Sequence, residues 1–91
     1  MTPKSLISKY GKKLMTKIIN TIIIKENCTD EEIRELLIEQ NIIQPKSKQK
    51  LRVDCYRGYG TDFFTVINGR GTHLIDVELP HDQMKELISL L

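Results

Sequence analysis

The 91-residue sequence contains no alanine, no tryptophan and only three tyrosines and two phenylalanines, while isoleucine is abundant. Isoleucine, lysine and asparagine have A/T-rich codons and alanine has G/C-rich ones. This bias therefore indicates an A/T-rich genome, such as that of a low-GC bacterium or one of its phages. An apolar share of 40% with 29% charged residues is typical of a globular chain rather than a disordered one. We expect one small domain over residues 1–91.

Long apolar runs are also missing, which excludes a membrane protein. The most apolar segment, residues 18–24, is too short to cross a bilayer and contains Asn20 and Thr21. Lysines interrupt every apolar run near the N-terminus, so we expect no secretory signal and a cytoplasmic protein.

Residues with catalytic or metal-binding chemistry are scarce. The two cysteines, Cys28 and Cys55, form no CxxC motif and have no neighbouring histidine. We expect reduced thiols, with a single disulfide as the alternative. No paired carboxylates, nucleophile motif or phosphate-binding loop is present. We therefore expect no metal, no cofactor and no enzymatic activity.

Charge alternates along the chain behind a net value of +2. Residues 1–25 hold six lysines and no acid, and residues 26–41 hold six acids against Arg34. Residues 42–60 are basic again, with five basic side chains against Asp54, and residues 61–91 are acidic. The acidic block could neutralise the first basic block, or the two basic blocks could form one or two binding patches.

Helical periodicity fills the first half of the chain. Thr2-Pro3 is a typical helix start, and apolar residues then recur on a four-residue spacing as far as Ile23. Lys9, Lys13 and Lys17 form a stripe on another face, and Gly11 marks a kink or a break between two shorter helices. A second helix begins at Thr29, where Thr29 and Glu32 predict a capping box, and ends near Asn41.

Alternating patterns fill the second half. A basic connector over residues 44–50 leads to three predicted strands. The first covers residues 51–56, where apolar and polar residues alternate. The second covers residues 63–67, after a Gly58-Tyr59-Gly60 turn, and the third covers residues 72–79, after an Asn68-Gly69 hairpin signal. His73 falls on the apolar face of the third strand. A last helix over residues 81–91 places Met84, Leu87, Ile88 and Leu91 on one stripe. The predicted fold is α+β, with two N-terminal helices (residues 1–43), a three-stranded antiparallel meander and a C-terminal helix, in the order ααβββα.

One short motif resembles an RNA-binding signature. Arg57-Gly58-Tyr59-Gly60 is similar to the start of the octapeptide of RNA-recognition-motif domains, whose aromatic residues stack on bases. The next two positions, Thr61 and Asp62, depart from that octapeptide, and no strand precedes the helices. The sequence therefore favours a Gly-Tyr-Gly turn that displays Tyr59.

A second motif, Gly71-Thr72-His73, resembles the Gly-Ser/Thr-His motif of toxin endoribonucleases that have an αβββα fold like that of double-stranded-RNA-binding domains. The resemblance implies that His73 is catalytic. The chain departs from that family in having one strand after the histidine where the family has two. It also carries an extra N-terminal helix. A winged-helix arrangement is excluded, because its recognition helix would be the acidic segment 30–41, which phosphates repel.

The sequence thus predicts a non-enzymatic binding protein of phage or mobile-element type that acts stoichiometrically on nucleic acid or on a host nucleic-acid-handling protein. A protein-binding inhibitor, such as an anti-defence protein of the anti-CRISPR kind, is the alternative, and an endoribonuclease that uses His73 is the third. A homodimer is compatible with each. The candidate binding residues are basic or aromatic and cluster around the connector and the first strand: Lys46, Lys48, Lys50, Arg52, Arg57, Tyr59 and Arg70.

Overall fold

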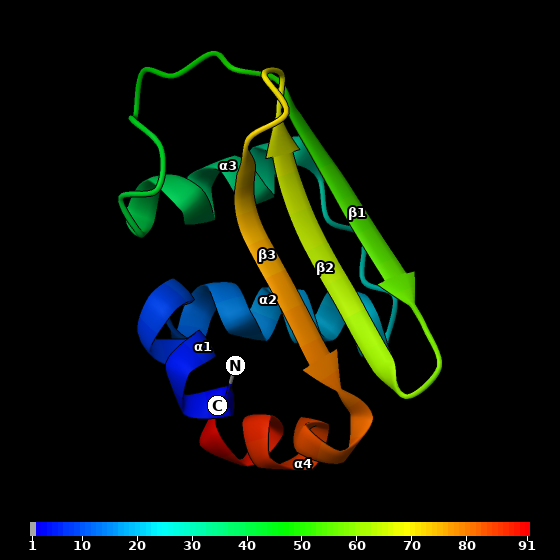
Figure 1. The fold of residues 1–91 in the computed structure, drawn as a ribbon. Coiled ribbons are helices and arrows are strands. Elements are labelled where there is room, and N and C mark those ends of the chain that lie inside the picture. Colours follow the sequence, from blue (N-terminus) through cyan, green and yellow to red (C-terminus); the bar gives the residue numbers. More distant parts are fainter. Residues whose placement is uncertain (1) are drawn as a thin grey trace.

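A computed structural model describes residues 2–91, and it contains helices followed by a small sheet (Figure 1). The described elements, in chain order, are α1 (Pro3–Tyr10), α2 (Lys12–Ile23), α3 (Asp30–Glu39), β1 (Leu51–Arg57), β2 (Thr61–Asn68), β3 (His73–Pro80) and α4 (His81–Leu90). None of these helices is long and apolar enough to cross a membrane.

The three strands form an antiparallel meander in the order β1-β2-β3. The α+β fold, with its sheet and its C-terminal helix, is therefore confirmed. Figure 1 shows that α2 and α3 pass behind the sheet and that no segment of residues 2–91 lies in front of it. Because neighbouring strand residues face opposite ways, Ile75, Val77 and Leu79 are fully buried while Asp76 and Glu78 are exposed.

The core lies between that inner face and the helices. Its helical members follow the predicted four-residue spacing, and its strand members follow the predicted alternation. Burying aliphatic side chains of this size stabilises the fold by roughly 1.5–3 kcal/mol each. The largest fully buried residues are Leu6, Leu14, Met15, Ile18, Ile22, Ile33, Leu37, Phe64, Val66, Ile75, Leu79 and Leu87.

The predicted first helix is two helices, so three helices and not two precede the sheet. The break is at Gly11, whose φ of 82° is unfavourable for residues with a side chain. Its N–H still donates to the carbonyl of Ile7, at 2.7 Å, and its own carbonyl accepts from Met15, at 3.0 Å. A β-carbon built on Gly11 would come 2.5 Å from the side chain of Gln40, so the α1–α2 corner fits closely against the end of α3.

Both predicted helix starts are confirmed, but the second one differs in detail. Thr2 and Ser5 form a complete reciprocal capping box at α1. At α3, Thr29 Oγ1 accepts from the backbone N–H of Glu32 at 3.2 Å, which is the predicted cap. The carboxylate of Glu32 does not complete the box, because it is bonded to Lys17 of α2 instead.

The β2–β3 hairpin indicated by Asn68-Gly69 is present, and its loop begins one residue later than the predicted strands, 63–67 and 72–79, imply. Four residues, 69–72, connect the strands. Asn68 determines this loop: its side-chain Oδ1 accepts from the backbone N–H groups of Arg70, at 2.9 Å, and Thr72, at 3.0 Å. An asparagine that bonds to its own loop in this way stabilises a wider turn than the dipeptide alone indicates.

His73 does not lie on the buried face of β3, contrary to the prediction. The pairing of β2 with β3 is irregular between Val66 and Ile67, since Val66 pairs with Ile75 but Ile67 pairs with His73. The extra residue, Leu74, shifts the alternation by one position, so His73 is exposed.

The predicted apolar stripe of α4 is only partly buried. Leu87 is fully buried and Met84 is half-buried, whereas Ile88 and Leu91 are 47% and 37% exposed. The reason is that α4 packs on α1 and on the end of β3 at the margin of the sheet, where it contacts the core along a narrow line (Figure 1).

Tyr10, the last residue of α1, contacts the outer edge of the sheet. Its buried hydroxyl accepts from the backbone N–H of Asp76 at 3.2 Å and donates to the carbonyl of the same residue at 3.5 Å. Asp76 is in β3, an edge strand whose outward backbone groups would otherwise be free to pair with another strand.

The Thr29 cap gives a direct test of where α3 begins. Thr29→Ala should lower the free energy of unfolding by about 1 kcal/mol through loss of the cap. Thr16→Ala should cost much less, because Thr16 bonds only the carbonyl of Lys12 within a helix that alanine favours. Equal losses in denaturant melts would contradict the assignment of the cap.

Candidate nucleic-acid interface

The basic connector is held in place by one arginine of the acidic helix. Arg34 of α3 donates from Nη1 to the carbonyl of Ser47, at 3.1 Å, and from Nη2 to the carbonyl of Gln49, at 2.6 Å. Two charge-assisted bonds from one planar group fix both the position and the direction of this segment. The predicted connector is thus an ordered strap across the end of α3.

The strap turns its lysines outward. Along an extended chain neighbouring side chains point to opposite sides. Ser47 and Gln49 are half-buried, and Lys46, Lys48 and Lys50 are exposed. Lys48 and Lys50 are alternate residues of the extended part of the strap, roughly 6.6 Å apart along the backbone. Lys46 precedes this part, in a turn closed by the N–H of Ser47 on the carbonyl of Gln44 at 3.0 Å.

The β2–β3 loop adds to the same end of the sheet. Asn68 donates from Nδ2 to Oε1 of Gln49 at 2.9 Å, which ties the loop to the strap. A shallow groove between them is lined by Lys50, Gly69 and Arg70, among others. We call the exposed cations at this end the basic edge; they are Lys46, Lys48, Lys50, Arg52 and Arg70.

Five of the seven predicted binding residues therefore lie together, and the other two do not. Arg57 and Tyr59 are at the opposite end of β1, which is about 20 Å long for seven residues. Tyr59 is fully exposed at the tip of the β1–β2 turn and does not lie on the sheet. Tyr56 and Phe63, neighbours on β1 and β2, have ring centroids 5.9 Å apart.

Arg57 has a structural partner that was not predicted from the sequence. Its Nε donates to Oδ1 of Asp62 at 3.1 Å, and Nε2 of His81 lies 3.1 Å from the same oxygen. Asp62 is fully buried, and its Oδ2 has no hydrogen-bond partner within residues 2–91. The available signal was its place on the inner face of β2, in alternation with Phe64 and Val66. The carboxylate joins the β1–β2 turn to the start of α4.

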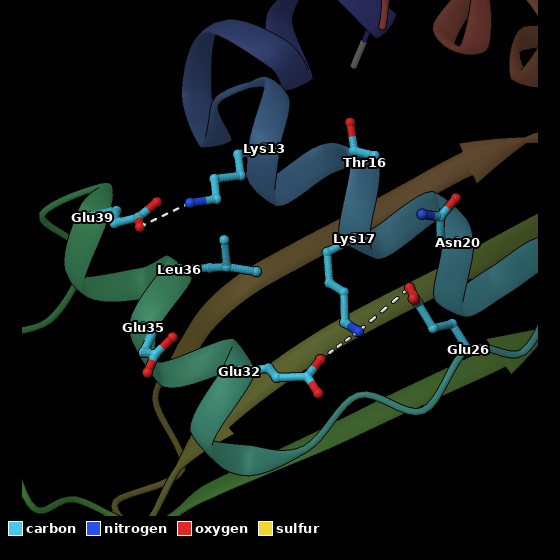
Figure 2. Close-up of a pocket in the computed structure, with 9 residues that line it drawn as sticks. All are labelled: Lys13, Thr16, Lys17, Asn20, Glu26, Glu32, Glu35, Leu36 and Glu39. Carbon is cyan, nitrogen blue, oxygen red and sulfur yellow. Dashed lines mark hydrogen bonds and ion pairs between the residues drawn. The ribbon is translucent and has the colours of Figure 1, made fainter.

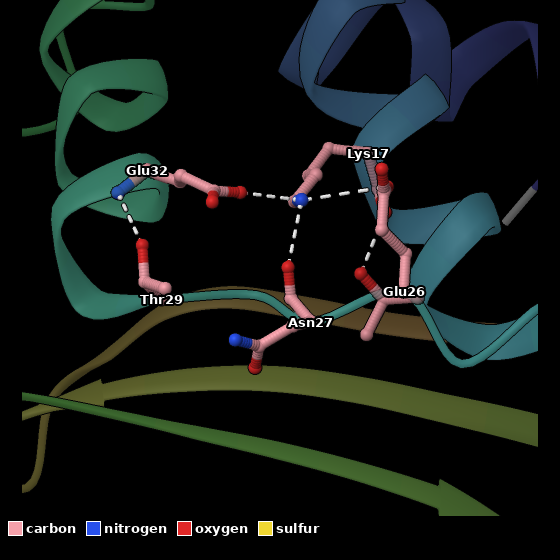
Figure 3. Close-up of polar contacts among 6 residues, drawn as sticks. Lys17, Glu26, Asn27, Thr29 and Glu32 are labelled. Atoms are coloured by element: carbon pink, nitrogen blue, oxygen red, sulfur yellow. Dashed lines mark hydrogen bonds and ion pairs between the residues drawn. The ribbon is translucent and has the colours of Figure 1, made fainter.

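Two lysines of the first basic block make internal ion pairs, in contrast to the lysines of the basic edge. Lys13 and Lys17 project from α2 across a cleft toward α3 (Figure 2). Lys13 pairs with Glu39 at 3.0 Å. Lys17 pairs with Glu32 and Glu26 and donates to the carbonyl of Asn27 (Figure 3). Two of the three lysines of the stripe are thus paired with the acidic block, whereas Lys9 is exposed and lies over the ring of Tyr10, 5.3 Å from its centroid.

The environment of Lys17 differs from that of a surface lysine. Its side chain is only 14% exposed. Hydrogen bonding to Glu32 raises the pKa of Lys17 above its ordinary value, in spite of partial desolvation. The same bond holds the pKa of the Glu32 carboxyl below its ordinary value.

The remaining candidates show less organisation. The exposed His73 makes no hydrogen bond or ion pair to any side chain of residues 2–91. Cys28 and Cys55 are free thiols that line one groove beside β1, and burial raises the pKa of each. Within the described residues no three histidine, cysteine, aspartate or glutamate side chains are grouped closely enough to hold a metal ion.

Comparisons with known proteins found no matching family model, no matching curated protein and no matching solved structure. The function of the protein is therefore inferred from the geometry and charge of the residues described above.

Arg34 can be tested as the residue that positions the strap. Arg34→Ala should lower the free energy of unfolding by about 1.5–3 kcal/mol, because two part-buried carbonyls lose a charged donor. Arg70→Ala should change it by less than about 0.5 kcal/mol, since that exposed side chain has no hydrogen bond within residues 2–91. Denaturant unfolding of both variants is the measurement, and equal losses would mean that the strap does not depend on Arg34.

The Lys17–Glu32 pair predicts a pH dependence of stability. Since the folded-state pKa of Glu32 is lowered, its contribution is complete above the ordinary glutamate value of about 4.3 and is lost as the pH falls through the folded value. Since the pKa of Lys17 is raised, its contribution is complete below about 10.4 and is lost as the pH rises through the folded value.

The measurement is the difference in unfolding free energy between the wild type and Glu32→Gln over a pH series. That difference should be constant in the neutral range and shrink at both extremes. Glu31→Gln is the matched control, because Glu31 is exposed and forms no ion pair within residues 2–91. A wild-type advantage over Glu32→Gln that persists unchanged in strong acid would contradict the pairing.

Proposed function

We propose that the protein binds single-stranded nucleic acid stoichiometrically, without catalysis, through the phosphates that meet the basic edge. The observation that carries the proposal is the clustering of exposed cations at the basic edge, where Arg34 holds the strap that carries three of them. Lys13 and Lys17 are paired with acids of α3 and the loop before it. Lys46, Lys48, Lys50 and Arg70 have no carboxylate partner within residues 2–91, although six acids occupy the preceding segment.

The spacing of the lysines suits a phosphate backbone. The separation of Lys48 and Lys50, roughly 6.6 Å along the extended part of the strap, is close to the spacing of phosphates along a single strand. Phosphate contacts of this kind supply affinity without reading sequence. A strap held by Arg34 also loses less conformational entropy on binding than a free lysine-rich linker would. The proposal is therefore of general, salt-sensitive binding, in keeping with a small protein of phage or mobile-element type.

A second candidate is a protein-binding inhibitor of a host factor, favoured by the aromatic end of β1. Tyr59 is fully exposed, and Tyr56 is exposed beside Phe63 on the uncovered face of the sheet. Exposed tyrosines of this kind commonly anchor protein interfaces. The endoribonuclease alternative gains no support from the surroundings of His73.

Salt dependence tests the proposal. Titration of a labelled oligothymidine or oligouridine by fluorescence anisotropy should give a log affinity that falls with log salt at a slope of roughly −3. This follows from about four neutralised phosphates at about −0.7 each. Lys48→Glu with Lys50→Glu should weaken binding strongly without unfolding the domain, because both side chains are exposed.

The matched control is Lys12→Glu with Lys85→Glu, which changes the net charge equally at two exposed positions on α2 and α4. Binding by this control should be close to that of the wild type. Equal loss in both double variants would indicate a diffuse charge effect and not a site. Absence of binding at low salt would overturn the proposal and leave the protein-inhibitor candidate, with Tyr56 and Tyr59 as the residues to test next.

A further inference from the structure

The strand β1 has a free backbone edge. Gly58 donates its N–H to the carbonyl of Thr61 at 2.8 Å, so the backbone of Gly58 faces β2. Hydrogen-bonding direction alternates along a strand, and the backbone groups of Arg52, Asp54 and Tyr56 therefore face β2 as well. The N–H and C=O groups of the intervening residues point away from the sheet, and no protein group of residues 2–91 bonds to them; these residues are Leu51, Val53, Cys55 and Arg57.

The same alternation is independently supported at the other edge. In β3 it predicts that the backbone of Asp76 points outward, and Asp76 is the residue whose N–H and C=O are bonded by Tyr10. One edge of the sheet is thus occupied at Asp76 by a side chain of the same chain, whereas no such contact is made along the other edge within residues 2–91. A groove runs beside the open edge, lined on the β1 side by Val53, Cys55 and Arg57 and on the other side by residues 25–28.

The geometry points to a second copy of this chain as the occupant of the open edge, with β1 pairing antiparallel to β1 across a two-fold axis at Val53. The charge pattern of β1 favours this partner. In this register Arg52 of each copy lies opposite Asp54 of the other, in two symmetric positions. Shifting the register by one pairing step places Arg52 opposite Arg52, or Asp54 opposite Asp54. Like charges directly opposite each other are destabilising, so the pattern selects one register.

The side chains are available for this pairing. Arg52 and Asp54 are 72% and 51% exposed and form a pair within the chain at 3.1 Å, which an exposed location makes weak. Because these residues bond to β2 through their backbones, they would form non-hydrogen-bonded cross-strand pairs, where side chains approach most closely. The product is one continuous six-stranded antiparallel sheet built from two three-stranded sheets.

The dimer also joins the two separated halves of the predicted site, a consequence that rests on the proposed function. With Val53 at the centre, the start of β1 in one copy lies beside the end of β1 in the other, which carries Tyr56. The strap that precedes β1 in one copy is thus brought to the same end of the joined sheet as the β1–β2 turn of the second copy, which carries Tyr59. Each of the two resulting sites combines phosphate-binding lysines with an aromatic ring that can stack on a base.

The first measurement is the mass in solution without nucleic acid, by sedimentation equilibrium over a concentration series. We expect a reversible approach to twice the chain mass of 10.6 kDa. A protein that stays at the chain mass throughout overturns the inference. Since no nucleic acid is present, this outcome is independent of whether the proposed function is correct.

The second measurement is a charge-swap cycle at the two-fold axis. Arg52→Asp alone and Asp54→Arg alone each place like charges opposite each other, and each should raise the dimer dissociation constant by at least about tenfold. The double variant, Arg52→Asp with Asp54→Arg, restores both opposite-charge pairs and should recover the wild-type constant.

Circular dichroism verifies that all three variants stay folded, and Glu78→Arg, at an exposed position of β3, is the matched control that should dimerise like the wild type. Dimers of equal strength in all variants would overturn the inference, because association would then use another surface. Loss of dimerisation in the double variant as well as in the single ones would also overturn the register.

Discussion

The guanidinium of Arg34 is the contact on which the functional end of the molecule depends. Chain that leaves α3 must return to the sheet, and its backbone carbonyls need donors on the way. Arg34 supplies donors to Ser47 and Gln49, only a few residues before β1 begins. The side chain of Gln49 in turn accepts a hydrogen bond from Asn68, which fixes the β2–β3 loop beside the strap. One cation in an acidic helix therefore sets the entry into the sheet and the direction of the lysines beside it.

The role of each lysine depends on the side chains around it and not on its residue type. Lys17 is largely shielded between Glu26 and Glu32, where it holds the start of α3 against α2. Lys48 is exposed, on a segment whose own polar contacts are made by its neighbours Ser47 and Gln49. The first lysine stabilises the fold, and the second contributes a positive potential at the surface. A phosphate backbone meets only charges of the second kind.

Local signals in the sequence predicted most of the fold. Thr29 was recognisable as a cap, and the alternation of Ile75, Val77 and Leu79 identified the buried face of β3, because each depends on a few adjacent residues. The break at Gly11 was left open, since a glycine within an apolar repeat is compatible with a kink or a break. The loop after Asn68 is wider than the two-residue turn that an Asn-Gly dipeptide favours, because the side chain of Asn68 accepts from the backbone of Arg70 and Thr72.

Features that depend on tertiary contacts could not be predicted from the sequence. Asp62 reads as a polar residue at a turn, and its burial is compatible with folding only because Arg57 and His81 converge on it. The exposure of His73 follows from one unpaired residue in the β2–β3 ladder. In the candidate site, the sequence identified the lysines of the connector, but it could not show that Arg34 holds them or that Tyr59 lies a strand length away.

The hydroxyl of Tyr10 has a consequence for how the sheet can grow. A three-stranded sheet with two open edges could add copies at both, and repeated head-to-tail addition produces a filament with no defined end. Because Tyr10 occupies the outward groups of Asp76, a strand that added on that side would have to displace these bonds. Pairing through β1, as proposed above, would use the same surface on both partners and close after two chains. The buried phenol of Tyr10 thereby favours finite assembly over polymerisation.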